Sequence, residues 1–288
     1  MPRYEYLYGQ TLSQLEALCN RLEMPRFAAK QIARWLYDKH ATTIEAMSDL
    51  SVRHRALLAE TYEVGFTSPE KVSISADGTK KYLYRTSQNH FIESAYIPDG
   101  DRATLCISSQ AGCRMGCRFC ASTLDGLVRG LTPAEMLEQI YRVGEDIGER
   151  ISNVVVMGTG EPLDNYENLL RFITMLTDEN GLNISQRNLT VSTCGIVPKI
   201  KELAEEKLQM TLALSLHASN QKKRQELMPI ANKYDIEEVI DACKYYFSKT
   251  GRRVTFEYSL VAGVNDTKED AEELSRLIHG MNCHVNLI

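Results

Sequence analysis

The stretch Cys113-Arg114-Met115-Gly116-Cys117-Arg118-Phe119-Cys120 places three cysteines in a C-x3-C-x2-C pattern, with an aromatic residue before the last one. A [4Fe–4S] cluster is usually held by four thiolates, so a set of three leaves one iron open for an exchangeable ligand. Gly112 and Gly116 lie among the cysteines, and glycine lets a backbone wrap closely around a bound group. We therefore predict a [4Fe–4S] cluster on Cys113, Cys117 and Cys120.

Two simpler interpretations of the cysteines are weaker. Structural zinc normally takes four nitrogen or sulfur ligands. No fourth Cys or His follows at C-x2-C or H-x3-H spacing nearby, although Cys106 lies upstream and His217 far downstream. Three buried structural cysteines would be the default for an arbitrary triplet, but the interleaved glycines argue against it. The eight cysteines of the chain suggest metal chemistry in a reducing compartment rather than a disulfide framework.

Length and charge limit the possible classes of protein. A chain of 288 residues fits one large α/β domain with a small appendage. No apolar run approaches the roughly 20 residues of a membrane helix, and the start, Met-Pro-Arg-Tyr-Glu-Tyr, lacks signal-peptide features, so we expect a cytoplasmic protein. The net charge of -5 argues against a general nucleic-acid coat, but residues 1–60 carry eight Lys and Arg against seven Asp and Glu. Any RNA contact should therefore be local.

The N-terminal part predicts a small helical module over residues 1–65. Leucines recur at helical spacing from Leu12 to Leu22, a second apolar stripe runs from Ala28 to Leu36, and a third helix is expected near 52–61. Strands are then expected near 71–75, 80–85 and 90–97, with Asp77-Gly78 as a hairpin turn. We interpret residues 66–102 as an antiparallel extension or linker.

From residue 103 to 288 the pattern alternates between strand and helix. We expect strands at 104–108, 153–158, 188–193, 210–216, 253–260 and 284–288, and helices at 133–147, 166–178, 197–206, 236–249 and 268–280. This alternation predicts an α/β fold, a partial (β/α)6 barrel. Active sites of such folds lie at the carboxyl ends of the strands, and the cysteines follow the first of these strands.

Polar residues and glycines follow the later strands as well. The second strand is followed by Gly158-Thr159-Gly160-Glu161-Pro162, the third by Ser192-Thr193-Cys194-Gly195, and the fourth ends in Ser215-Leu216-His217. A loop with Gly, Glu and Pro is often only a turn, and a lone His on a strand is more often structural than a ligand. Because these segments recur at one edge of the sheet, we expect them to line one site.

Taken together, these segments resemble the RlmN/Cfr family of radical S-adenosylmethionine (SAM) adenosine methyltransferases. The resemblance covers Glu93 to Pro98, Arg102 to Gln110, the cysteine loop, Met157 to Pro162, the Ser192 and Ser215 segments, and Leu227-Met228-Pro229-Ile230. It runs from the helical module to the last residue. It implies a radical SAM barrel behind a module that resembles a helix-hairpin-helix domain.

The resemblance also implies a cofactor set and a chemistry. The open iron would bind SAM, and one electron from the cluster would yield a 5′-deoxyadenosyl radical. SAM contacts would fall on Gly160, Glu161, Ser192, Ser215, Leu216 and His217. Glu93 would act as general acid/base when the adenine ring loses a proton; without the resemblance, Glu93 reads as an exposed glutamate on an edge strand.

Partners follow from the same resemblance. RlmN-type members methylate C2 of an adenosine in the peptidyl-transferase region of 23S rRNA and of an adenosine next to the tRNA anticodon, through a methyl-cysteine, whereas Cfr-type members methylate C8. An external flavodoxin-like reductant would supply electrons, and we expect a monomer without membrane contact. Candidate cations for RNA phosphates are Arg26, Lys30, Arg34, Lys80, Lys81, Arg129 and the run Lys222-Lys223-Arg224.

The chain departs from the family pattern at its end. It stops at Asn286-Leu287-Ile288, where relatives continue into a segment with the methyl-bearing cysteine, and none of Cys19, Cys106, Cys194, Cys243 and Cys283 matches that position. We therefore expect a fragment of a longer enzyme that binds the cluster and SAM without methylating RNA. Two alternatives stay open: a different radical SAM enzyme, and a non-catalytic RNA-binding or assembly protein.

Overall fold

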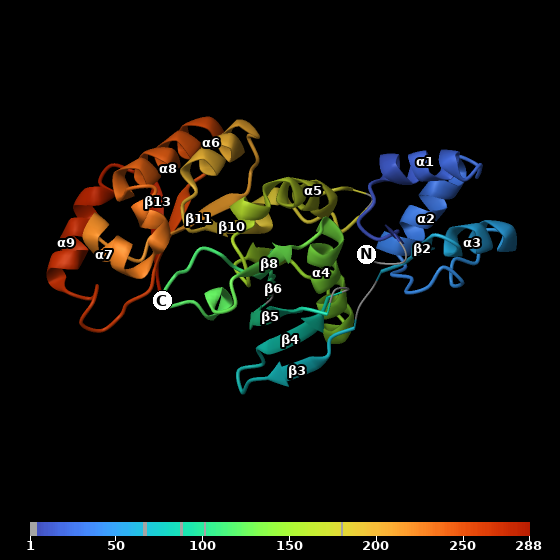
Figure 1. Ribbon diagram of the computed structural model, residues 1–288, viewed down its shortest axis with the longest axis horizontal. Coiled ribbons are helices and arrows are strands. Elements are labelled where there is room, and N and C mark those ends of the chain that lie inside the picture. Colours follow the sequence, from blue (N-terminus) through green and yellow to red (C-terminus); the bar gives the residue numbers. More distant parts are fainter. Residues whose placement is uncertain (1–4, 66–67, 87–88, 101, 180) are drawn as a thin grey trace.

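A computed structural model describes residues 5–65, 68–86, 89–100, 102–179 and 181–288, and Figure 1 shows the chain. The helical N-terminal module, drawn in blue, lies at one end, and the last helices, in orange and red, lie at the other. No helix among these residues is both long and apolar enough to cross a membrane. The first four residues, used above to argue against a signal peptide, and residue 66, where we place a domain boundary, lie outside the described residues.

The N-terminal module contains the predicted helices. They are α1 (Leu12–Arg21), α2 (Phe27–Tyr37) and α3 (Val52–Ala59). Thr11 begins α1 with a capping box, which supplies partners to otherwise unpaired backbone amides. A two-residue parallel pair, β1 (Glu5–Tyr6) with β2 (Tyr62–Glu63), closes the module and was not predicted.

After the N-terminal module, nine of the described strands form one continuous sheet. Its order is β13-β12-β11-β10-β9-β6-β5-β4-β3. The strands are β3 (Lys71–Ile74), β4 (Lys80–Arg85), β5 (Phe91–Asp99), β6 (Arg102–Cys106), β9 (Asn153–Val156), β10 (Leu189–Thr193), β11 (Thr211–Ser215), β12 (Val254–Tyr258) and β13 (Cys283–Leu287). Pairing is antiparallel from β3 to β6 and parallel from β6 to β13. The six parallel strands follow chain order and, as described, form an open sheet, in agreement with a partial barrel.

Helices connect the parallel strands as the alternation predicted. They are α4 (Pro133–Ile147), α5 (Tyr166–Leu176), α6 (Val197–Glu205), α8 (Ile236–Thr250) and α9 (Lys268–Leu277). A further helix, α7 (Gln221–Leu227), was missed because Gln-Lys-Lys-Arg-Gln-Glu-Leu has no apolar stripe; Arg224 is its buried residue. Short 3-10 turns lie at Ala121–Thr123, Pro162–Asn165, Gln186–Asn188 and Pro229–Asn232.

Candidate functional site

A small hairpin presents the three cysteines. Strand β7 (Gln110–Gly112) pairs antiparallel with β8 (Leu127–Gly130), and the cysteine loop lies between them. Gly112 has a φ of 73°, and the amide of Cys113 donates to Gly126 O at 2.9 Å. An added Cβ at position 112 would lie 2.0 Å from that same oxygen, so only glycine lets the loop leave the strand here.

The cysteine side chains fit an iron–sulfur cluster. Cys113 and Cys117 are buried and Cys120 is half-buried. Burial, followed by the neighbouring Cys113 and Cys120, raises the pKa of the Cys117 thiol to about 12. Within the described residues no three Cys, His, Asp or Glu side chains converge on one metal ion. A [4Fe–4S] cluster would not need side chains that converge on a single ion, because each thiolate would bind a different iron. The positive charge of the irons would favour the deprotonated form of each thiol.

The loop is fixed against the end of α7. The Arg118 amide donates to Leu227 O at 3.0 Å. Cys117 packs with Cys194 and Met228 in a small apolar cluster that is separate from the main core. Such an apolar shell limits water access around a metal group. The ends of β10 and α7 therefore form the floor beneath the cysteine loop.

Glu161 turns its carboxylate into the protein. The side chain is 3 % exposed; one oxygen accepts from the Cys194 amide at 2.7 Å and the other from the Leu163 amide at 3.0 Å. Burial raises the pKa of this carboxyl, while those hydrogen bonds oppose the shift. The predicted SAM contact of this side chain stays a prediction; the geometry shows that it joins the loops after β9 and β10.

Gln110 and Asp164 are functional candidates that sequence reading missed. Gln110 accepts from the Glu161 amide at 2.8 Å and donates to Asp164 at 3.1 Å, and Asp164 also pairs with Arg114 of the cysteine loop. An added Cβ on Gly160, whose φ is 112°, would lie 2.6 Å from the Gln110 Cβ. The cysteine loop and the glycine loop are thus joined directly. No sequence pattern predicts these hydrogen bonds between the two loops.

The strand ends bring the other predicted SAM residues together. Ser192 on β10 and Ser215 on β11 lie side by side, with their hydroxyl oxygens 3.4 Å apart. Leu216 is fully buried and His217 is 5 % exposed. The Phe119 ring of the cysteine loop meets the His217 ring edge-on, at 4.7 Å between centroids. The structure therefore places the cysteine loop against this predicted SAM segment.

His217 is held as a neutral imidazole. Its Nδ1 accepts the Ser259 amide at 3.0 Å, and its backbone oxygen accepts from Asn265, another residue that sequence reading missed. Burial, and then the nearby Arg224, lower the pKa of this ring to about 4. At neutral pH the proton is therefore on Nε2, which is available as a donor.

Glu93 lies on β5, next to the strand that leads to the cysteines. Its carboxylate is about half exposed and pairs with Lys81 at 2.8 Å. Its backbone oxygen accepts from Ser108 Oγ at 2.5 Å, and the same Oγ accepts the Thr159 amide at 2.9 Å. Glu93 is thereby tied through one hydroxyl to the glycine loop, and its acid/base role stays a prediction.

Several predicted phosphate contacts are wrong or already paired. Arg224 is fully buried and cannot reach RNA. Arg129 donates to both Glu135 oxygens, at 2.6 and 2.8 Å, Lys80 pairs with Asp146 at 2.7 Å, and Lys223 pairs with Asp270 at 2.7 Å. The exposed candidates are Arg26, Lys30, Arg34, Lys81 and Lys222. Of these, Lys81 pairs with Glu93 at 2.8 Å, and Arg26 lies 3.8 Å from Glu16.

The Lys223–Asp270 pair predicts a pH-dependent stability. Burial alone would raise the pKa of Asp270, but hydrogen bonds from Lys223, Ser219 and Thr267 lower it well below its usual range. The pair therefore stabilises the fold above the unfolded pKa of about 3.9, and this contribution is lost as the pH falls below it. Lys223→Met should lower the free energy of unfolding by about 1–2 kcal/mol at pH 7.

Urea unfolding at several pH values measures this effect, with Lys222→Met on the exposed side of the same helix as the control. The deficit of Lys223→Met should shrink as the pH falls below about 4. A deficit that stays constant across that range would contradict the assignment.

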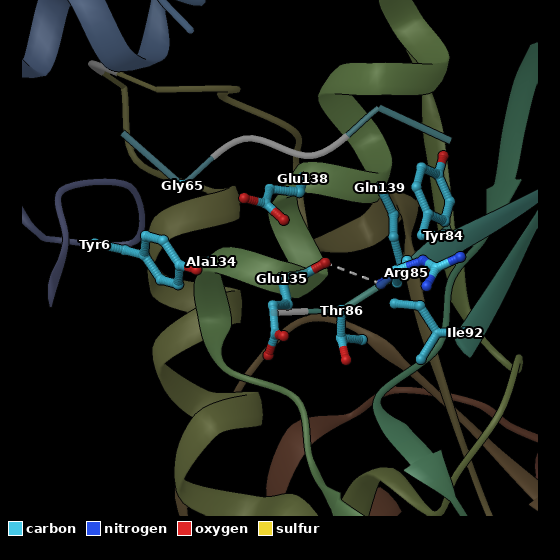
Figure 2. Close-up of a pocket in the computed structure, with 10 residues that line it drawn as sticks. All are labelled: Tyr6, Gly65, Tyr84, Arg85, Thr86, Ile92, Ala134, Glu135, Glu138 and Gln139. Carbon is cyan, nitrogen blue, oxygen red and sulfur yellow. Dashed lines mark hydrogen bonds between the residues drawn. The ribbon is translucent and has the colours of Figure 1, made fainter. Parts of the chain in front are cut away.

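A separate pocket, drawn in Figure 2, lies where α4 meets the antiparallel strands. The side-chain amide of Gln139 donates to Glu135 O at 3.1 Å and to Ser108 O at 3.0 Å, and its oxygen accepts the Ser108 amide at 2.8 Å. Glu135 is held by Arg129. These polar groups brace the end of β6, and we assign the pocket no ligand.

Comparisons with known proteins identify the family of this chain. The family model described as the radical SAM superfamily matches residues 107–278, and the model of the ribosomal RNA large subunit methyltransferase N-terminal domain matches residues 6–64. A probable dual-specificity RNA methyltransferase RlmN of Lachnospira eligens is 58 % identical over 91 % of this chain and 75 % of the relative. The chain belongs to the RlmN family of radical SAM proteins.

Further RlmN relatives and a solved structure support the assignment. The corresponding protein of Lachnoclostridium phytofermentans is 53 % identical over 96 % of this chain and 78 % of its own length. A crystal structure of a radical SAM methyltransferase from Sphaerobacter thermophilus is 44 % identical, with a TM-score of 0.93, and covers 98 % of this chain and 84 % of the other. RlmN family membership, the α/β fold and the enzyme class expected from the sequence are therefore confirmed.

Proposed function

We propose that this chain carries the cluster, SAM and RNA sites of an RNA methyltransferase that acts on C2 of adenosine, in 23S rRNA and in tRNA beside the anticodon. One observation carries the proposal: the three-cysteine loop lies against the carboxyl ends of β10 and β11, beside Ser192, Ser215 and His217. The names of the RlmN relatives supply the dual RNA specificity. A Cfr-type reaction at C8 and a non-catalytic role in assembly stay as alternatives.

Separate groups of residues would bind the cluster, SAM and RNA. Cys113, Cys117 and Cys120 would hold a [4Fe–4S] cluster, which when bound supplies the electron that cleaves SAM. The Gly160 loop and the Ser192, Ser215 and His217 side chains would orient SAM. Glu93 would take the ring proton that the adenine loses on methylation, with Lys81 positioning its carboxylate. Arg26, Lys30 and Arg34 would bind RNA phosphates.

The cofactor and the partners imply a cellular setting. The cluster needs an external one-electron reductant of the flavodoxin type. All eight cysteines are free thiols in the structure, which fits a reducing, cytoplasmic environment.

Product analysis tests the proposal. Anaerobically reconstituted protein is incubated with SAM, a reductant and an rRNA fragment, beside a version extended with the C-terminal segment of the Lachnospira eligens relative. Both proteins should form 5′-deoxyadenosine, and the extended one should form 2-methyladenosine, as detected by mass spectrometry. A reaction without reductant is the control.

Other products would decide between the alternatives. Detection of 8-methyladenosine would favour the Cfr-type reaction. A bound cluster without any 5′-deoxyadenosine would reject the enzyme assignment and favour the assembly role.

A further inference from the structure

Arg224 is a buried cation that has no counter-charge within the described part of the chain. Its side chain is fully buried on α7, where Nη2 donates to Cys194 O at 2.7 Å. Among the residues that the structure describes, no hydrogen-bond partner meets its Nε or Nη1, and no carboxylate is among its charged neighbours. A guanidinium stays protonated in proteins, and burying a charge without a partner is strongly unfavourable. Its burial is therefore costly unless a counter-charge lies close to it.

The Arg224 guanidinium lies against the segment that packs beneath the cysteine loop. Its Nη2 donates to Cys194 O at 2.7 Å. The Cys194 side chain packs with Cys117 and Met228. The guanidinium therefore lies next to the residue on which Cys117 rests.

We propose that Arg224 is a positioning residue that supplies the counter-charge for an iron–sulfur cluster on Cys113, Cys117 and Cys120. The inference rests on the proposed function, since it needs that cluster. A thiolate-bound cluster is anionic, and accepting one electron from the external reductant adds a negative charge. Net charge and hydrogen bonding near the sulfurs set the reduction potential of such clusters. A cation in a region of low dielectric constant therefore favours the reduced form.

The contact with Cys194 does not explain the residue by itself. That carbonyl uses one N–H group of Nη2, and the weaker approach of Nη2 to Ser215 O is 3.5 Å. A neutral donor could serve the same carbonyl without bringing a charge into the core. A structural role does not account for Nε and Nη1, which have no partner among residues 5–65, 68–86, 89–100, 102–179 and 181–288.

The test compares Arg224→Met, Arg224→Lys and Lys222→Met with the unchanged chain. After anaerobic reconstitution, iron and sulfide are quantified, and a redox titration follows the reduced cluster by electron paramagnetic resonance. In Arg224→Met the reduced-to-oxidised ratio at a fixed potential should fall about tenfold, which equals about 59 mV for a one-electron couple. Arg224→Lys keeps the charge and should titrate close to the unchanged chain, as should the exposed Lys222→Met.

Cluster-free protein provides the second measurement. Because Met replaces an unpaired buried charge by an apolar side chain of similar volume, cluster-free Arg224→Met should melt at or above the temperature of the unchanged chain. A lower melting temperature, or failure to fold, would show a structural role and overturn the proposal. So would an unchanged potential in Arg224→Met, or a shift in Arg224→Lys as large as that in Arg224→Met.

The two proposals fail differently. If the unchanged chain binds no iron and sulfide, the proposed function and this inference fall together. If it binds a cluster and cleaves SAM while Arg224→Met keeps the same potential, the inference about Arg224 alone is overturned.

Discussion

Cys117→Ala is expected to abolish cluster binding and, with it, SAM cleavage. Two thiolates would remain, and Cys117 is a buried residue of the loop that packs on Cys194 and Met228. Iron and sulfide after reconstitution should fall to background. Formation of 5′-deoxyadenosine should fall by more than the roughly 100-fold that loss of an outer-shell partner costs.

Cys194→Ala is the matched control. Cys194 lies in the same small apolar cluster as Cys117, and the substitution likewise removes one thiol. The backbone amide that Glu161 accepts from is unchanged by this substitution. Cys194→Ala should therefore retain bound iron and sulfide. Loss of the cluster in Cys194→Ala, with retention in Cys117→Ala, would reverse the ligand assignment.

Gly112→Ala should be the most destabilising substitution in the cysteine hairpin. Its φ is 73°, and an added Cβ would lie 2.0 Å from Gly126 O, a backbone atom that cannot step aside alone. Any backbone shift that relieves this clash would also break the hydrogen bond from the Cys113 amide to Gly126 O. We expect a loss of about 4 kcal/mol in the free energy of unfolding, measured by urea titration, together with poor cluster loading.

Gly126→Ala separates backbone strain from the clash. Gly126 also has a positive φ, 69°, but an added Cβ there meets nothing within 4 Å. It should cost about 1–2 kcal/mol, the penalty for an L-residue in the left-handed region. Equal losses of unfolding free energy in Gly112→Ala and Gly126→Ala would contradict the clash with Gly126 O as the reason for glycine at position 112.

The sequence was sufficient to predict the bounds of an element where its apolar periodicity and its capping residues agree. Helix α4 begins at Pro133 after the Thr132 capping box, ends at Ile147 before the left-handed Gly148, and matches its prediction at both ends. The six parallel strands also lie within a few residues of their predicted positions. The order of motifs then placed the cysteines after the first parallel strand, where the structure has them.

The parts that the sequence could not predict depend on contacts between distant segments. The inward direction of Glu161 is set by the Cys194 amide, 33 residues away. The burial of Arg224 within a run of charged residues is decided by the packing of α7 beneath the cysteine loop, and a basic run ordinarily indicates a solvated face. No local pattern carries such information, because it arises only when strand ends from separate βα units meet.

Ser108 has a consequence for how the enzyme accommodates its target. One hydroxyl holds the backbone of the strand that carries Glu93 and, at the same time, the Thr159 amide of the glycine loop. The Ser108 hydroxyl thus links the β5 backbone at Glu93 to the glycine loop, so a shift of one segment displaces the other. Their relative position is set when the chain folds, before SAM or RNA binds.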